Sequence, residues 1–452
     1  MSTPRDAEAA TGDARAVAWR IVRAVHRDGA WTGPAVDRAL RGSTLDARDR
    51  AFASNLAFQA LRWEGTLDWA LGHVVRRPLD DVEDELRDLL RIGAWQLLYG
   101  RMPDRAAVSA TVDVARSELG ARTVGFANGV LRNLARRRDA LSWPAADSVD
   151  GRALRTGYPR WVVEAADARF GTDADRQLAA GNEPARLTVR AGDAVAVRAA
   201  LTALGAQVRT GALAPEALYV EGIAPAAVLD AAPDAVIQDE ASMVVGHAAA
   251  AAVPDGARVL DMCAAPGGKA THVAALGRKV TAADRSATRL GLVDDLARRL
   301  GQPVPLVVAD GTRSPWRPGA FGGVLLDAPC SGLGVVRRRP ELRWRRDVAD
   351  VTALAALQRD LLAAAADAVA PGGALVYSVC TWTRQETVDV IGAFLSTHDD
   401  FVAEPMADGV GRAAEDVEPG RQLTPAEHGC DGMYLAVLRR RVDGVPDPAH
   451  RR

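Results

Sequence analysis

The feature that most constrains the fold is an alternation of short apolar runs and helical segments in the second half of the chain. From about Asp234 onward, β-branched runs such as ARVLDMC, PLVVAD and GGVLLDAPC are separated by longer segments with helical periodicity. Strands that alternate with helices are typical of a parallel sheet with helices on both faces. We therefore expect residues 234–452 to form an α/β Rossmann-like domain, with the runs FVAEP and GMYLAVLRRR as an antiparallel pair at one edge.

The ends of these predicted strands carry acidic and sulfur-bearing residues. In open α/β sheets, ligands bind outside the carboxyl ends of the strands, near the point where the strand order reverses. The first run ends in DMCAAPGGK, from Asp261 to Lys269. The later runs end at or near Asp284, Asp310, Asp327, Cys330 and Cys380. We expect these residues to lie along one rim of the sheet, which predicts a ligand site there.

The CAAPGGK turn indicates a nucleoside-bearing cofactor. Gly267 and Gly268 let the backbone approach a ligand closely, and Asp284, about 20 residues further on, is placed to accept bonds from a ribose. The G-x-G-x-x-G fingerprint of dinucleotide sites is absent, which disfavours a nicotinamide-dependent oxidoreductase. The structural alternative is that the glycines only shape a turn and Asp284 caps the next helix. Lys269 is one of only two lysines, so we expect it to hold a carboxylate or a phosphate.

The cysteines are few, and two of them share one local setting. Their positions are 263, 330, 380 and 430, and no two lie within four residues of each other, so we predict no metal site and no disulfide framework. Cys380 precedes a predicted helix start, where Thr383 and Glu386 have the spacing of a capping box. A helix N-terminus favours an ionised thiol. The alternative is that Cys330 and Cys380 are small buried hydrophobic residues, and we assign no role to Cys430.

A thiolate beside a cofactor suits one demanding reaction, the alkylation of an unreactive ring carbon. Addition of a thiolate to carbon 6 of cytosine places electron density on carbon 5, which can then attack the methyl group of a sulfonium donor. Asp327 is a candidate to protonate or hydrogen-bond the ring nitrogen. Local chemistry alone does not choose between Cys330 and Cys380 as the attacking sulfur.

The first half of the chain predicts a separate domain. With 452 residues, the chain is too long for one ordinary core. Residues 1–141 have apolar positions at helical spacing and predict a compact all-α domain. Residues 142–233 predict a linker rich in Pro, Gly, Ser and Asp, followed by a small α+β unit. No apolar run approaches the length of a membrane span and no signal-peptide core is present, so we expect a cytoplasmic protein with no membrane partner.

A cluster of arginines stands out against a net charge of only −2. The segment RRRPELRWRR follows Cys330 closely and could clamp the phosphates that flank a target base, with its tryptophan stacking on a base. The alternative is a solvated loop in an arginine-rich protein. The predicted RNA-binding residues are Arg337, Arg338, Arg339, Arg343, Trp344, Arg345 and Arg346.

Together these motifs resemble those of the Sun (Fmu) family of RNA cytosine-C5 methyltransferases. LDMCAAPGGKATH, ADRSATRL, LLDAPCSGLGVVRRRPELRWRR, ALVYSVCT and GCDGMYLAVL match the family's motifs in the family's order. The helical N-terminus resembles the NusB-like RNA-binding domain of the bacterial ribosomal-RNA members, so the resemblance covers nearly the whole chain. It departs from the family's common T-C-S at Val379-Cys380-Thr381.

The resemblance implies a cofactor, a substrate and residue roles. The donor would be S-adenosylmethionine, and the target a cytosine of small-subunit (16S) ribosomal RNA, with no obligate protein partner. Asp284 would hold the ribose of the donor and Asp310 its adenine, while Asp327 would lie between donor and base. Cys380 would be the attacking thiolate, and Cys330 would help to release the product. The residues expected around the methionine end of the donor are Cys263, Ala264, Ala265, Pro266, Gly267, Gly268 and Lys269.

Two alternatives remain open from the sequence. The same chemistry could act on transfer RNA. The chain could also be a non-catalytic RNA-binding or assembly factor, because its N-terminus resembles an antitermination module.

Overall fold

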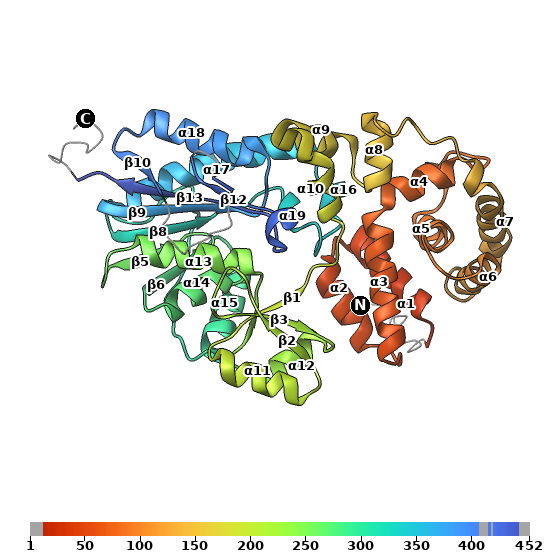
Figure 1. Cartoon of the computed structure of the whole chain (residues 1–452), viewed down its shortest axis with the longest axis horizontal. Coiled ribbons are helices and arrows are strands. Elements are labelled where there is room, and N and C mark those ends of the chain that lie inside the picture. The colour runs from red at the N-terminus through yellow and green to blue at the C-terminus, as the bar shows by residue number, and fades with distance from the viewer. Residues whose placement is uncertain (1–11, 406–414, 417–418, 443–452) are drawn as a thin grey trace, which may run out of the picture. The chain divides into compact units, whose positions relative to one another are not determined.

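The computed structural model describes residues 12–405, 415–416 and 419–442. The ends of the two predicted terminal domains, residues 1–11 and 443–452, lie outside the described residues. The described chain divides into two compact units (Figure 1). The first contains residues 12–182 and a later segment, residues 336–345; the second contains the remainder.

The first unit is all-α, as the sequence predicts. Its helices are α1 (Ala14–Asp28), α2 (Thr32–Arg41), α3 (Ala47–Arg62), α4 (Glu64–Gly72), α5 (Asp84–Leu98), α6 (Asp104–Val114), α7 (Ala121–Arg137), α8 (Val149–Thr156), α9 (Arg160–Phe170), α10 (Ala174–Ala180) and α16 (Leu342–Arg345). Helix α1 begins where the Asp13 carboxylate accepts a bond from the amide of Arg15, and it ends at Gly29 with φ 66°.

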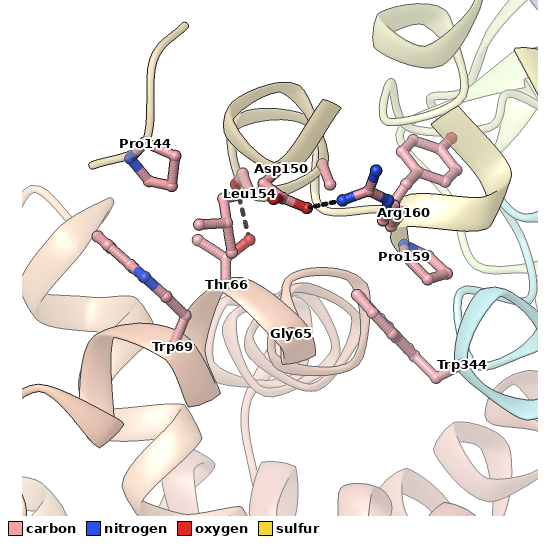
Figure 2. Close-up of a pocket in the computed structure, with 11 residues that line it drawn as sticks. Gly65, Thr66, Trp69, Pro144, Asp150, Leu154, Pro159, Arg160 and Trp344 are labelled. Atoms are coloured by element: carbon pink, nitrogen blue, oxygen red, sulfur yellow. Dashed lines mark hydrogen bonds and ion pairs between the residues drawn. The ribbon is translucent and has the colours of Figure 1, made fainter. Parts of the chain in front are cut away.

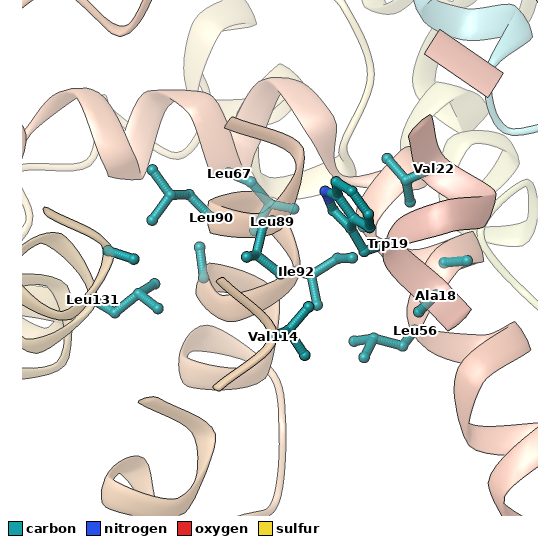
Figure 3. Close-up of a cluster of buried hydrophobic side chains, with 14 of the residues drawn as sticks. Ala18, Trp19, Val22, Leu56, Leu67, Leu89, Leu90, Ile92, Val114 and Leu131 are labelled. Atoms are coloured by element: carbon teal, nitrogen blue, oxygen red, sulfur yellow. The ribbon is translucent and has the colours of Figure 1, made fainter. Parts of the chain in front are cut away.

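The core of the first unit forms around α5, which is buried on most of its faces. Figure 3 shows Trp19 of α1, Leu56 of α3 and Leu67 of α4 packed around Leu89 and Ile92 of α5. All five side chains are at most 1% exposed. Burial of five such side chains contributes on the order of 10 kcal/mol to the free energy of unfolding before chain entropy is counted.

Residues 142–159 do not form the linker that their composition predicts. They contain α8, and the chain continues directly into α9 and α10; all three helices belong to the first unit. The Ser, Gly and Pro residues mark the ends of these short helices. Ser148 caps α8 through a 3.0 Å bond from the amide of Gly151, Gly157 ends it with φ 66°, and Pro159 precedes α9. Helix-capping residues and linker residues are of the same types, so composition alone could not separate the two.

The second unit begins with a small antiparallel sheet, in the order β2-β3-β1-β4. Its elements are β1 (Leu187–Arg190), α11 (Ala194–Ala203), β2 (Gln207–Thr210), β3 (Ala217–Glu221), α12 (Pro225–Ala231) and β4 (Val236–Ile237). This is the small α+β unit that the sequence predicts.

The main sheet runs β11-β12-β13-β9-β8-β5-β6-β7, with β10 paired to β13. Its strands are β5 (Arg258–Asp261), β6 (Lys279–Asp284), β7 (Leu306–Val308), β8 (Phe321–Asp327), β9 (Val369–Val379), β10 (Phe401–Glu404), β11 (Glu415–Asp416), β12 (Arg421–Leu423) and β13 (Met433–Arg440). Strands β9, β8, β5, β6 and β7 are parallel. Strands β10 and β13 pair antiparallel, which confirms the predicted edge pair.

Helices cover both faces of the main sheet, which confirms the predicted Rossmann-like fold (Figure 1). One face packs against α17 (Val348–Ala368) and α18 (Val388–Thr397), and the other against α13 (Glu240–Ala252), α14 (Gly268–Ala275) and α15 (Ala287–Arg299). The strand order reverses between β5 and β8. A ligand crevice is therefore expected beyond the carboxyl ends of these two strands. Within the described residues, no helix is both long and apolar enough to cross a membrane.

Candidate active site

The turn after β5 has a geometry that suits a ligand with a positively charged group. Asp261, at the end of β5, is 1% exposed, and neither of its carboxylate oxygens has a hydrogen bond of good geometry, although the backbone amide of Cys263 lies close enough to act on it. Burial raises the pKa of Asp261 to about 8, and the nearby Asp327 adds to this shift. A bound cation would compensate this carboxylate, because a buried charge without a partner is costly. The ammonium of an amino-acid-bearing cofactor is such a cation.

Gly267 makes the tight approach of this turn possible. Its φ is 106°, and a Cβ at this position would lie 3.0 Å from the Cα of Val293 on α15. The preceding turn is closed by a 2.7 Å bond from the amide of Gly267 to the carbonyl of Ala264. A residue with a side chain would be strained here, so the sequence argument for a close backbone turn is supported.

Asp284 and Asp310 follow the next two strands, as predicted. The Asp284 carboxylate is nearly buried and accepts a 3.0 Å bond from the amide of Ser286, and Arg289 lies 3.4 Å away. Asp310 is exposed, and bonds from the amide and hydroxyl of Thr312 lower its pKa. Both side chains therefore accept hydrogen bonds at the rim.

Lys269 and Asp327 form an ion pair at the strand reversal. Lys269 Nζ lies 2.7 Å from Asp327 Oδ2, and the Lys269 side chain is 12% exposed. The other carboxylate oxygen, Oδ1, accepts a 2.8 Å bond from the hydroxyl of Ser378 on β9. Although burial acts to lower it, the pKa of Lys269 is raised, chiefly by Asp327 and also by Cys380. A stable positive charge therefore lies beside the cysteines.

Cys330 and Cys380 are brought together by the parallel pairing of β8 with β9. Asp327 lies opposite Ser378 in the register. Cys330, three residues after Asp327, and Cys380, two residues after Ser378, therefore become neighbours. Their Sγ atoms are 3.3 Å apart. The bond to Cys380, together with burial, raises the pKa of Cys330 well above its ordinary value. Cys330 is therefore the sulfur that keeps its proton.

Cys263 lies in the same turn but has a different environment. Burial and the nearby Asp261 raise the pKa of its thiol to about 12, so it remains neutral. Its predicted neighbours in the turn, Ala264 and Ala265, are buried, whereas Pro266 is exposed. Cys430, for which no role is predicted, is buried.

Sequence comparisons place these features in a known family. Residues 248–439 match the profile of 16S rRNA methyltransferase RsmB/F, and residues 12–136 match that of the NusB family. The ribosomal RNA small subunit methyltransferase B of Xanthomonas campestris is 35% identical over 94% of this chain and 96% of its own length. A Mycobacterium tuberculosis protein, named as a methyltransferase without a stated substrate, is 38% identical over 94% of this chain and 96% of its own length. The chain belongs to the RsmB/F family. It is an S-adenosylmethionine-dependent RNA methyltransferase.

Solved structures agree with this fold. The crystal structure of a protein named PH0851 covers 97% of this RsmB/F member and 100% of its own chain, with a TM-score of 0.80 and 23% identity. A methyltransferase homolog protein from Pyrococcus horikoshii covers 66% of this chain and 100% of its own, with a TM-score of 0.54 and 24% identity.

This RsmB/F member also contains a buried hydrogen-bond network that the sequence motifs did not predict. Glu386 is fully buried, and its carboxylate accepts bonds from the amide (2.7 Å) and hydroxyl (2.6 Å) of Ser331, next to Cys330. It also accepts a 2.8 Å bond from the hydroxyl of Thr383 and a 3.1 Å bond from Gln358 on α17. The predicted capping box is wrong, because Thr383 makes no side-chain cap. Glu386 instead ties together the two loops that carry the cysteines.

The predicted RNA-binding role is contradicted for the buried Arg337 and Arg343 of this RsmB/F member and stays a prediction for the other residues of the arginine segment. Arg343 is fully buried, donates 2.9 Å bonds to the carbonyl of Gly157 and the side chain of Asn182, and packs 3.9 Å above the ring of Tyr158. Arg345 donates a 2.8 Å bond to the carbonyl of Ala30. These carbonyls lie at helix ends, where backbone acceptors lack partners and a cation is favourable.

The other members of the segment vary in exposure. Arg337 is buried, Arg338 and Arg346 are half-buried, and Arg346 lies 4.0 Å from Asp350. Arg339 is exposed, with its guanidinium 5.0 Å from the ring centre of Trp31. Arg339 therefore keeps a guanidinium that solvent can reach.

Trp344 lines a cleft in the helical unit. The cleft has a volume of about 420 Å³ (Figure 2). The indole nitrogen of Trp344 donates a 2.7 Å bond to the carbonyl of Leu61, and a Cβ at Gly65 would lie 2.6 Å from the ring. Trp344 thus packs tightly on α4 and presents only part of its ring to the cleft, whose opposite side contains Trp69.

Proposed function

We propose that the chain transfers a methyl group from S-adenosylmethionine to carbon 5 of a cytosine in 16S ribosomal RNA, through a covalent bond between Cys380 and carbon 6. The observation that carries the proposal is the pair of sulfur atoms 3.3 Å apart, beside the Lys269–Asp327 ion pair at the strand reversal. The name of the relatives, ribosomal RNA small subunit methyltransferase B, supports the choice of RNA.

The donor supplies an electrophilic methyl group when it is bound. On this chain, Asp261 would hold its ammonium, Asp284 its ribose and Asp310 its adenine. Gly267 would let the turn that carries these residues pack closely on α15, because a side chain there would meet Val293. The buried carboxylate of Asp261, whose oxygens have no hydrogen bond of good geometry, supports this fit.

Cys380 is the better nucleophile of the two cysteines. A thiolate at Cys380 is stabilised by a bond from the Cys330 thiol and by the charge of Lys269. Its attack forms a sulfur–C6 bond and moves an electron pair towards C5 and the ring nitrogen. Asp327 is placed to hold that nitrogen, and Lys269 can supply a proton through it.

Release of the product completes the balance of the reaction. Carbon 5 takes the methyl group, loses its hydrogen as a proton, and the sulfur–C6 bond breaks to return the Cys380 thiolate. The net products are 5-methylcytosine, S-adenosylhomocysteine and one proton. Cys330, whose sulfur adjoins that of Cys380, is placed to assist this elimination.

The test uses labelled S-adenosylmethionine with RNA and small subunits from a strain that lacks the gene. C380A should abolish methyl transfer, and C330A should accumulate a protein–RNA adduct that survives a denaturing gel. C430A, at a buried cysteine of the same unit, is the matched control and should behave as wild type. Full activity of C380A would refute the nucleophile. Bisulfite mapping that finds the lost mark in transfer RNA would refute the substrate.

A further inference from the structure

A second cluster of chemically active side chains lies in the second unit, apart from the residues that the mechanism uses. It contains Glu216, His247 and His272, one ligand atom from each lying within 4.8 Å of the others. Glu216 directly precedes β3 of the small sheet, His247 is on α13, and His272 is on α14. Three separate elements therefore contribute one potential metal ligand each.

The geometry around Glu216 is compact. His247 Nε2 lies 3.0 Å and 3.1 Å from the two carboxylate oxygens, and His272 Nε2 lies 2.7 Å from Oε1. The two imidazole rings meet edge to face, with centroids 5.1 Å apart. Ligands of a tetrahedral zinc ion at about 2.0–2.1 Å lie roughly 3.3 Å from one another. Small side-chain rotations would bring the three ligand atoms to that spacing.

His272 is the strongest sign that this cluster takes a ligand. It is 1% exposed, and neither ring nitrogen has a hydrogen bond of good geometry, despite the short distance to Glu216. Buried polar atoms without such bonds are rare in folded proteins. Gly246 of α13 makes room for the ring, since a Cβ there would lie 2.2 Å from its Nδ1.

We propose that Glu216, His247 and His272 bind one divalent transition-metal ion, zinc in preference to magnesium or calcium. Two imidazoles and one carboxylate are a donor set that suits zinc and leaves a fourth position for water. The positive charge of Arg190 acts against a cation at this site, and its guanidinium is held by bonds to Gln238 and Thr271. The ion would join the small sheet to α14, the helix that starts in the CAAPGGK turn.

The inference revises the expectation of no metal site drawn from the cysteine spacing. The three ligands are 25 to 56 residues apart in the sequence, so they match no short metal-binding motif. Only the packing of the small sheet against α13 and α14 brings them together. The proposed metal site is independent of the proposed methylation, because metal binding is measured without RNA or donor.

The test is zinc binding to the full, tag-free chain, by calorimetry and by elemental analysis after dialysis. Wild type should bind one zinc ion per chain, and zinc should raise its unfolding temperature. H247A removes one proposed ligand at a half-buried position. Changes outside the ligand set can already weaken metal binding about tenfold, so the zinc affinity of H247A should fall by at least that factor. The rise in unfolding temperature that zinc produces should also be lost. H247Q repeats the test with a side chain of similar size.

Two controls separate this site from others. H398A removes a half-buried histidine of the same unit that stacks on Phe394, and it should bind zinc as wild type does. C380A removes one thiol of the cysteine pair and should also keep the zinc. Absence of stoichiometric zinc in wild type, equal binding by H247A, or loss of the ion in C380A would each overturn the proposal.

Discussion

Glu386 gives the sharpest test of how the cysteine loops are held, because it is fully buried and touches no reacting atom. Five donors point at its carboxylate: the amide and hydroxyl of Ser331, the hydroxyls of Thr381 and Thr383, and the amide group of Gln358. In E386A the three hydroxyls can rotate to other acceptors, but the backbone amide of Ser331 and the amide of Gln358 cannot. Each buried unsatisfied donor costs about 1–3 kcal/mol.

We therefore expect E386A to lower the free energy of unfolding of the catalytic unit by about 3–5 kcal/mol, once the lost packing is added. E386Q keeps an oxygen for the Ser331 amide and turns its own amide towards the hydroxyls. It loses only the charge assistance of the bonds, about 1–2 kcal/mol. The measurement is urea unfolding of the full chain, following the transition that S-adenosylhomocysteine shifts.

The same variants should separate positioning from donor binding. Displacement of the cysteine loops by about 1 Å can cost about 100-fold in rate, so kcat of E386A should fall by about that factor while KM for the donor stays near the wild-type value. E386Q should recover most of the rate. D389N, at a half-exposed acid on the following helix, is the matched control. An E386A protein within about 1 kcal/mol of wild type and with its full rate would refute the reasoning.

Three further outcomes follow from the structure. The buried Asp261 has a folded-state pKa of about 8, above its unfolded value, so its stabilisation is present at low pH and lost as pH rises towards 8. Urea unfolding of the donor-free chain should show this fall in the free energy of unfolding. D261N should remove the pH dependence and stabilise the protein at pH 7 by on the order of 3 kcal/mol. Although burial acts to lower it, bonds to Asp88 and Glu64 raise the pKa of His26 to about 9. The stabilisation that the protonated His26 contributes is therefore complete below about pH 6.5 and lost as pH rises through 9. H26Q should destabilise the helical unit at pH 6 by about 2 kcal/mol more than at pH 10, and equal losses at both pH values would contradict this. A mild thiol oxidant should link Cys330 to Cys380 and stop methyl transfer until dithiothreitol is added; peptide mass mapping checks the link, and retained activity in the linked protein would exclude a catalytic role for the pair.

The rim of the main sheet could be predicted well from the sequence. Each predicted strand ended in a residue that can bind a ligand or react, and parallel pairing necessarily brings such ends together. Asp327 and Cys330 therefore lie beside Ser378 and Cys380, as the strand order predicts. The argument worked because short apolar runs and the residues that end them are local features of the sequence.

Other parts of the site depend on contacts that no local pattern encodes. Glu386 has the spacing of a capping residue, yet its carboxylate turns inward to Ser331, 55 residues earlier in the chain. The arginine segment has the composition of an RNA-binding loop, but Arg343 is buried against helix ends of the N-terminal unit. Charge composition indicates what a segment can bind, while burial decides whether it binds protein or solvent.

The short insertion at residues 336–345 has a consequence for the evolution and engineering of this chain. Besides the arginines already described, its Glu341 accepts a bond from the amide of Thr32 at the start of α2, and Trp344 occupies a carbonyl at the end of α3. Ten residues within the methyltransferase part of the sequence thus supply hydrogen-bond partners at the ends of helices α2 and α3, about 300 residues earlier in the chain. A helical unit expressed as residues 12–182 alone would lack this segment, so the amide of Thr32 and the carbonyl of Gly157 would lose their partners Glu341 and Arg343.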